Sequence, residues 1–254
     1  MDHPDAAAAD FPDLRRILYA GSPISTETLQ RGIGLFGCDF VQFYGATEMW
    51  IISLLRPEQH DLGRPGQLTS CGTPVHFVET RVVDSELKDV PEGAVGEFIV
   101  RSPVMFSGYW NQPDTTAAAL AGGWYRTGDL GRRDAAGYHY ILDRTRDMII
   151  TGGENVYSIE VERALAAHPE VVSVAVVGAP DGKWGEKVTA FVVPVPGSAL
   201  TEDDLKAHCR SLIAGYKVPK AIHIEQSLPQ TPSGKIQKAV LRRRLTAKPG
   251  ASTA

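Results

Sequence analysis

Five residues near the middle of the chain, Asp143 to Asp147, carry four charges and stand between two apolar runs. A segment of this kind does not belong in a core, because burying unpaired charge is costly, and it suits a solvated connection between domains. The 254 residues are long enough for two domains with separate cores. We therefore predict a large domain portion over 1–143, a hinge over 144–147 and a smaller domain over 148–254.

The residues before this boundary show two patterns. Arg16 to Tyr19 is a short strand candidate that ends in a turn at 21–23, and Ser25 then opens a helix. A second strand candidate, Phe40 to Phe43, follows. From about 68 to 142 the chain has short β-type runs separated by Gly, Pro and Asp turns. An α/β sheet fragment followed by an antiparallel sheet or small β-barrel is the fold expected here.

The residues after the boundary predict a compact α+β domain. Ser158 is the expected N-cap of a helix whose first turns carry Glu160 and Glu162, which are favourable against the helix dipole. The remaining predicted elements are strands over Val171–Val177, Val188–Val195 and Ala221–Ile224, and helices over Thr201–Ile213 and Lys238–Leu245.

Composition narrows the class of protein. The net charge is -4 with both signs interspersed, so a broad basic surface is absent from the sequence and nucleic acid is not an expected partner. The apolar runs are too short to cross a bilayer and the first residues lack a signal-peptide pattern, so we expect a cytoplasmic protein. Three widely spaced cysteines, Cys38, Cys71 and Cys209, form no metal-ligand pattern and are expected to be reduced and mostly buried.

A glycine pattern at residues 32–37 satisfies the dinucleotide-binding fingerprint Gly-x-Gly-x-x-Gly. It follows a predicted helix and precedes a strand, whereas pyrophosphate binding needs the reverse order. We interpret it as the glycine-rich C-terminal end of the predicted helix.

The segment Tyr44-Gly45-Ala46-Thr47-Glu48 lies at the carboxyl end of a predicted strand, where open α/β sheets place their ligands. It combines an aromatic face, a small turn, a hydroxyl and a carboxylate, as a nucleoside triphosphate with Mg²⁺ requires. The same residues also suit a plain strand-end turn with a solvated glutamate, and the segment alone does not decide between these interpretations.

Three further segments have the same ambiguity. Asp129, on a Gly turn, could accept both hydroxyls of a ribose or simply form the turn. The paired Gly152 and Gly153 allow close backbone approach to an extended ligand, or a plain hairpin. Lys235 follows Pro232-Ser233-Gly234 and presents a mobile positive charge, which suits an anionic transition state, although most surface lysines are merely solvated.

Taken together and in this order, these segments resemble the adenylate-forming superfamily of acyl-CoA ligases, nonribosomal-peptide adenylation domains and beetle luciferases. The resemblance runs from about Leu14 to Leu245. Residues 152–157, 180–186 and 216–220 are similar to the versions in CoA ligases for fatty or aryl acids. The resemblance implies the C-terminal portion of the large domain followed by a small mobile lid domain, with the family's phosphate-binding loop upstream of these residues. We therefore expect a partial enzyme whose partner is its own N-terminal half, and which is inactive alone.

The resemblance also implies site residues. The expected nucleotide site comprises Gly21, Ser22, Pro23, Tyr44, Gly45, Ala46, Asp129 and Arg144, with Thr47 at the phosphates and Glu48 as the Mg²⁺ ligand. The expected hinge residue is Arg146, where the family usually has Asp or Lys. Coenzyme A would be contacted by Gly152, Gly153, Trp184, Tyr216 and Lys220.

The implied chemistry has two half-reactions. A carboxylate attacks the α-phosphate of ATP while Lys235 and Mg²⁺ neutralise the developing charge, and a swing about Arg146 then lets the CoA thiol attack the acyl-adenylate. Met49 and Trp50 follow Glu48 and would suit an apolar acid. Two alternatives stay open, namely a non-catalytic interaction module and an adenylation domain that serves a carrier protein.

Overall fold

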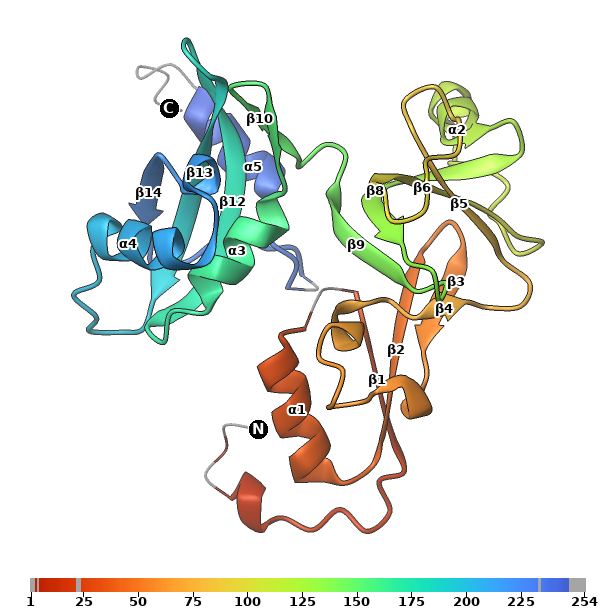
Figure 1. The fold of residues 1–254 in the computed structure, drawn as a ribbon, viewed down its shortest axis with the longest axis horizontal. Coiled ribbons are helices and arrows are strands. Elements are labelled where there is room, and N and C mark those ends of the chain that lie inside the picture. The colour runs from red at the N-terminus through yellow and green to blue at the C-terminus, as the bar shows by residue number, and fades with distance from the viewer. Residues whose placement is uncertain (1–2, 4, 22–23, 233, 247–254) are drawn as a thin grey trace. The chain divides into compact units, whose positions relative to one another are not determined.

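The computed structural model describes residues 3, 5–21, 24–232 and 234–246, and the chain divides into two compact units, Met1–Leu142 and Asp143–Ala254 (Figure 1). The charged segment 143–147 therefore lies at the start of the second unit. Among the described residues, every helix is too short or too polar to span a bilayer.

The first sheet of the first unit is built around a β-α-β crossover. Strands β1 (Arg16–Ala20) and β2 (Asp39–Ala46) pair in parallel, and the helix α1 (Thr26–Phe36) connects them. The sheet continues through β3 (Trp50–Leu55) and β4 (Thr73–Pro74) in the order β1-β2-β3-β4. Short 3-10 turns occupy Ala6–Ala8, Pro57–Gln59 and Gln67–Thr69.

Both ends of α1 follow from local sequence. Ser25 is the N-cap, and its hydroxyl accepts a hydrogen bond of 3.0 Å from the Thr28 amide. Gly37 ends the helix in the left-handed conformation and donates its N–H to the Ile33 carbonyl. The glycine pattern at 32–37 is thus part of α1 and its C-cap, as interpreted above.

The second sheet of this unit is the expected antiparallel one. Its order is β5-β6-β8-β7, and β9 pairs with β8. The strands are β5 (Glu79–Val83), β6 (Gly96–Arg101), β7 (Leu120–Ala121), β8 (Trp124–Arg133) and β9 (His139–Arg144), and α2 spans Pro113–Ala119. Phe98 and Val100 of β6 are fully buried.

The second unit is one mixed sheet with helices on both faces. Its strands are β10 (Ile149–Thr151), β11 (Glu154–Val156), β12 (Val171–Asp181), β13 (Gly185–Pro194) and β14 (Ala221–Ile224). Its helices are α3 (Ser158–Ala166), α4 (Glu202–Leu212), the 3-10 turn Gly215–Lys217 and α5 (Lys238–Thr246). The order is β11-β10-β13-β12, with β14 parallel to β13.

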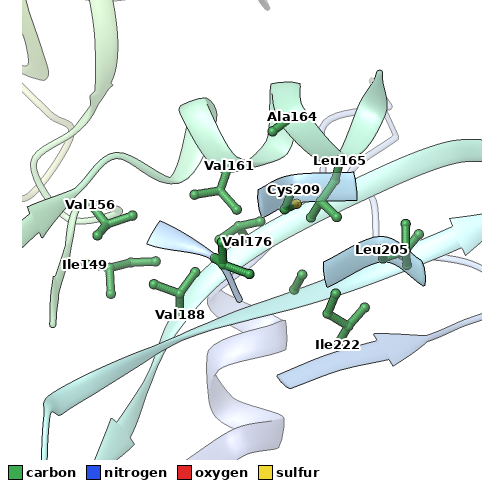
Figure 2. Packing of buried hydrophobic residues seen from close by; sticks show 13 residues of the cluster. Ile149, Val156, Val161, Ala164, Leu165, Val176, Val188, Leu205, Cys209 and Ile222 are labelled. Atoms are coloured by element: carbon green, nitrogen blue, oxygen red, sulfur yellow. The ribbon is translucent and has the colours of Figure 1, made fainter. Parts of the chain in front are cut away.

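Alternation along β12 divides the core of this unit into two clusters. Val176 packs with residues of α3 and α4, among them Val161, Leu165 and Leu205 (Figure 2). Ala175 and Val177 face the opposite way and pack with Leu241 of α5. Because successive strand residues point to opposite faces, α3 and α4 cover one face of the sheet and α5 covers the other.

One predicted cap is wrong. The N-cap of α3 is Tyr157, and Ser158 is the first helical residue. The Asp143 carboxylate supplies the capping contacts instead, since it accepts hydrogen bonds from both the Ser158 amide and the Ser158 hydroxyl. The predicted state of the cysteines is confirmed: none of the three is in a disulfide, Cys71 and Cys209 are buried, and Cys38 is partly buried.

Candidate functional site

The side chains of Tyr44 and Asp129 meet in the first unit. Tyr44 lies near the end of β2, Asp129 lies in β8, and the tyrosine hydroxyl donates a hydrogen bond of 2.6 Å to the carboxylate. Burial, reinforced by the negative charge of Asp129, raises the pKa of Tyr44 well above its ordinary value. The phenol therefore stays protonated and remains a donor to Asp129.

The turn that carries Asp129 is fixed by a buried carboxylate. Glu97 of β6 accepts three hydrogen-bond contacts from the Arg126 guanidinium and one bond of 3.2 Å from the Gly128 amide. The Thr127 hydroxyl donates to the Phe98 carbonyl at 2.7 Å and accepts from the Asp129 amide at 3.0 Å. The Asp129 backbone is thus anchored through the Thr127 hydroxyl, while its carboxylate accepts the bond from Tyr44.

The loop between β2 and β3 carries Thr47 and Glu48. Gly45 makes this loop possible: a Cβ at this position would lie 1.9 Å from the Trp50 carbonyl oxygen, so no other residue fits without moving the backbone. Trp50 itself has a φ of 64°, an unusual value for a bulky residue, and its side chain is 73% exposed. Met49, in contrast, is fully buried in the core.

The Glu48 carboxylate faces two tyrosines. The Tyr109 hydroxyl donates to it at 2.7 Å, and Tyr125 lies close enough for the charge of Glu48 to contribute to a raised tyrosine pKa, after burial as the main cause. The Glu48 carbonyl also accepts a bond of 2.8 Å from the Phe106 amide. A carboxylate that is fixed in this way still has free lone pairs, and oxygen donors suit Mg²⁺, which proteins commonly bind through one or two carboxylates.

The other predicted nucleotide residues lie at strand ends. Gly21 follows β1 with a φ of 86°. Ser22 and Pro23 lie outside the described residues. Ala46 ends β2 and Arg144 ends β9.

The predicted hinge forms a tight turn in the second unit. The Asp147 and Met148 amides both donate to the Arg144 carbonyl, at 2.9 and 3.0 Å. Arg146 is exposed on this turn, whereas Asp143 and Asp147 on either side are buried. The hinge candidate is thus flanked by two buried carboxylates.

Gly152 and Trp184, both predicted CoA contacts, lie together. The Gly152 amide donates to the Trp184 carbonyl at 2.9 Å. Gly152 has a φ of 61°, and a Cβ there would lie 2.9 Å from the indole, so the ring covers the glycine. Trp184 is 41% exposed, and the Lys183 ammonium lies 4.6 Å from its ring centre.

The other two predicted CoA residues belong to a different part of the unit. Tyr216 precedes Lys217, whose ammonium bonds both oxygens of Glu160 at 2.6 and 2.7 Å. Burial acts to lower the pKa of Lys217, but these bonds outweigh it and the pKa is raised. The Lys220 amide bonds the Val188 carbonyl, and its side chain is exposed.

Lys235 is exposed on a hairpin closed by its own backbone. The Thr231 amide donates to the Lys235 carbonyl at 2.8 Å, the Lys235 amide donates to the Thr231 hydroxyl at 3.1 Å, and the Gln237 amide donates to the Pro229 carbonyl at 2.8 Å. These bonds close the hairpin, and the Lys235 side chain is exposed on it.

The sequence did not predict two of the side-chain contacts, those of Tyr109 and Lys238. Tyr109, which binds Glu48, is separated from it by 61 residues. Lys238 was expected only as part of a basic helix, yet its ammonium donates to the Ser158 hydroxyl and pairs with Glu162, each at 2.7 Å. Neither residue stands in a local pattern that could have revealed its partner.

Family models match both units. The model described as "AMP-binding enzyme" covers residues 1–110, and the one described as "AMP-binding enzyme C-terminal domain" covers residues 160–235. These matches are in the chain order that the sequence resemblance implied.

Individual relatives differ in the group that receives the acyl chain. A medium/long-chain fatty acid–CoA ligase, FadD8 of Mycobacterium tuberculosis, is 42% identical over 96% of this chain and 44% of its own. A fatty acid–acyl-carrier-protein ligase, ScoC of Streptomyces coeruleorubidus, is 40% identical over 96% of this chain and 47% of its own. The solved structure of the amide bond synthetase McbA of Marinactinospora thermotolerans has a TM-score of 0.86 and 39% identity, over 96% of this chain and 50% of its own. The chain spans about half the length of the curated relatives it matches.

Proposed function

This chain belongs to the AMP-binding enzyme family, and on that premise we propose that it supplies the C-terminal half of an ATP-dependent acyl-CoA ligase. Such an enzyme joins a carboxylic acid to ATP, releases pyrophosphate, and transfers the acyl group from the adenylate to the thiol of coenzyme A. A fatty or aryl acid is the proposed substrate class, and the upstream half of the same enzyme is the proposed partner.

The observation that carries this proposal is the bond between Tyr44 and Asp129. It places an aromatic face beside a carboxylate at the carboxyl end of β2, where a base could stack and a ribose could be bound. A carboxylate can accept several hydrogen bonds at once, which suits recognition of ribose hydroxyls. Arg144 is the proposed second ribose contact.

Thr47 and Glu48 are proposed at the triphosphate. Thr47 is exposed on the loop after β2 and can donate a hydroxyl to a phosphate oxygen. Glu48, oriented by Tyr109, would hold Mg²⁺. The bound ion would supply positive charge next to the phosphates.

Lys235 is the proposed catalytic lysine of adenylation. The carboxylate oxygen of the acid forms a bond to the α-phosphorus, the bond to the bridging oxygen breaks, and pyrophosphate leaves with the electron pair. Negative charge on the phosphoryl oxygens is stabilised by the Lys235 ammonium. The hydrogen bonds of the hairpin restrict the backbone of Lys235.

Arg146 is proposed as the hinge between the two half-reactions. A reorientation about this turn withdraws Lys235 and brings the β10–β11 turn, which holds Gly152 and Gly153, into use for the thiol step. Trp184, Tyr216 and Lys220 are the proposed contacts for the nucleotide end of coenzyme A.

A second candidate acceptor is the thiol of a carrier protein. The 40% identity to ScoC, which is a ligase for an acyl-carrier protein, favours it as much as the 42% identity to FadD8 favours coenzyme A. A non-catalytic interaction module is the third candidate, and retention of Lys235, Glu48 and Asp129 speaks against it.

The test is ATP–pyrophosphate exchange with a panel of fatty and aryl acids. We expect no exchange with the chain alone and robust exchange when an upstream half is joined to it or added separately. Robust exchange by the chain alone would overturn the proposal that it needs that half. Transfer to coenzyme A or to a holo carrier protein then identifies the acceptor.

A further inference from the structure

The buried ionic groups of the second unit converge on the two ends of the hinge segment 143–147. At one end, the Lys238 ammonium donates to the Ser158 hydroxyl at 2.7 Å, and that hydroxyl donates to the Asp143 carboxylate at 3.0 Å. At the other end, the Arg242 guanidinium donates to the Asp147 carboxylate at 2.5 Å. Both basic residues come from α5, which begins three residues after Lys235.

The spacing of these contacts fixes the orientation of α5. Lys238 and Arg242 are four residues apart, so they lie on one side of the helix and about 6 Å apart along its axis. Asp143 and Asp147 are also four residues apart and lie on either side of the Arg146 turn. The helix can neither roll nor slide without breaking both contacts.

The charged groups on α5 and their partners are mostly buried, and the Arg242 and Asp147 side chains are 28% and 11% exposed. The side chains of Lys238 and Glu162 are 17% and 18% exposed, and Glu162 also accepts a bond of 2.7 Å from the Val176 amide. Burial raises the pKa of the Glu162 carboxyl, although Lys238 acts in the opposite direction. The charges therefore carry a desolvation cost that an apolar contact would avoid.

Attachment of α5 to the sheet does not require these charges. Leu241 is fully buried, and together with Leu245 it packs against Ala175, Val177 and Phe191. Since well-packed apolar residues often stabilise as much as a buried ion pair, the charges add orientation rather than attachment.

We propose that Lys238 and Arg242 are positioning residues that hold α5, and with it the Lys235 hairpin, against the hinge segment in this conformation, so that the position of Lys235 is coupled to the conformation of the hinge. This inference rests on the proposed function for its catalytic consequence, and on the contacts above for the mechanical coupling itself. Neither residue is expected to touch a substrate.

The coupling is tested first without activity, by amide hydrogen exchange on the full chain. In Arg242→Met we expect exchange to accelerate together in the hinge turn 144–148 and in the hairpin 229–237, at least about tenfold in both. Arg244→Met is the matched control, because Arg244 lies on the same helix, pairs with Glu225 at 3.7 Å, and forms no ion pair with a hinge residue among the described residues. Acceleration in one segment only, or equal acceleration in the control, overturns the coupling.

The catalytic consequence is tested in the complete enzyme by separating the half-reactions. Arg242→Met should lower the kcat of adenylation at least about tenfold, because a misplacement of about 1 Å can cost a hundredfold. Thioester formation from a supplied acyl-adenylate and the KM for ATP should each change less than about twofold. Equal loss of both half-reactions, or no loss, contradicts the positioning role.

Two further variants guard against misfolding. Asp147→Asn removes the same pair from the hinge side, and the double variant Arg242→Asp with Asp147→Arg should recover adenylation relative to either single reversal. No recovery would contradict the pairing. If the wild-type enzyme adenylates no acid, the proposed function fails, while the exchange experiment still decides whether hinge and hairpin are coupled.

Discussion

The Tyr44 hydroxyl donates a 2.6 Å hydrogen bond to the Asp129 carboxylate and so joins two motifs that lie 85 residues apart. The acceptor, Asp129, is only 7% exposed. The strength of the bond is therefore that of a charge-assisted hydrogen bond in a partly desolvated site.

Tyr44→Phe removes this donor and keeps the ring that could stack a base. We expect the free energy of unfolding to fall by about 1.5–3 kcal/mol, the usual range for a hydrogen bond to a charged group. Urea denaturation followed by tryptophan fluorescence measures it. Tyr140→Phe is the matched control, because the Tyr140 hydroxyl donates to the less buried Asp134 at 3.0 Å. This variant should lower the free energy of unfolding by less than Tyr44→Phe does. Equal losses in the two variants would show that burial of Asp129 adds nothing.

The stability of the first unit should change with pH because of His139. This side chain is fully buried, its Nε2 lies 3.2 Å from the Thr80 hydroxyl, and its Nδ1 has no partner among the described residues. Burial, with a smaller contribution from Arg133, lowers its pKa to about 4. Between about pH 6.5 and 4 the unfolded chain binds the proton and the folded chain does not, so stability rises with pH across this window.

The corresponding measurement compares urea denaturation of the wild type and His139→Gln from pH 7 to pH 4. As the pH falls below 6.5, the wild type should lose up to about 1.4 kcal/mol per pH unit more than the variant. Parallel curves for the two proteins would mean that His139 is not the titrating group.

Gly152 and Gly153 offer a matched pair for the contact with Trp184. Both have a positive φ, of 61° and 86°, but a Cβ at Gly152 meets the indole whereas a Cβ at Gly153 has nothing within 4 Å. Each alanine variant should cost about 1–2 kcal/mol of backbone strain, and only Gly152→Ala should displace Trp184. We expect its tryptophan emission to shift and, in the complete enzyme, its KM for coenzyme A to rise more than those of Gly153→Ala. Adding Trp184→Ala to both variants should remove the difference, and a difference that persists would exclude the indole as its cause.

Local features of the fold were predictable because their causes are local. Ser25 caps α1 through an amide three residues away, and Gly37 ends the helix four residues from the carbonyl it binds. Strand β3 escaped prediction because Trp50–Leu55 is an apolar run without alternation. The Ser158 hydroxyl suits an N-cap by its local sequence, but the Asp143 carboxylate, which comes close only in the folded chain, makes the capping contacts instead.

The site was predictable in its residue types and not in its contacts. Each motif named residues suited to a nucleotide, yet the partners of Glu48 and Glu162 come from segments far away in sequence, Tyr109 and Lys238. Pairing of this kind depends on tertiary structure, which no periodicity or spacing encodes. Family resemblance supplied the order of the motifs, and the structure supplied their partners.

The most direct test of the proposed chemistry is Lys235→Ala in the complete enzyme, with the two half-reactions measured separately. Lys235 is exposed and its side chain supports no core, so the variant should fold as the wild type does. We predict loss of ATP–pyrophosphate exchange by at least about a hundredfold, as for removal of one transition-state contact, with thioester formation from a supplied acyl-adenylate largely intact. Equal loss of both half-reactions, or unchanged exchange, would contradict the assignment of Lys235 to adenylation.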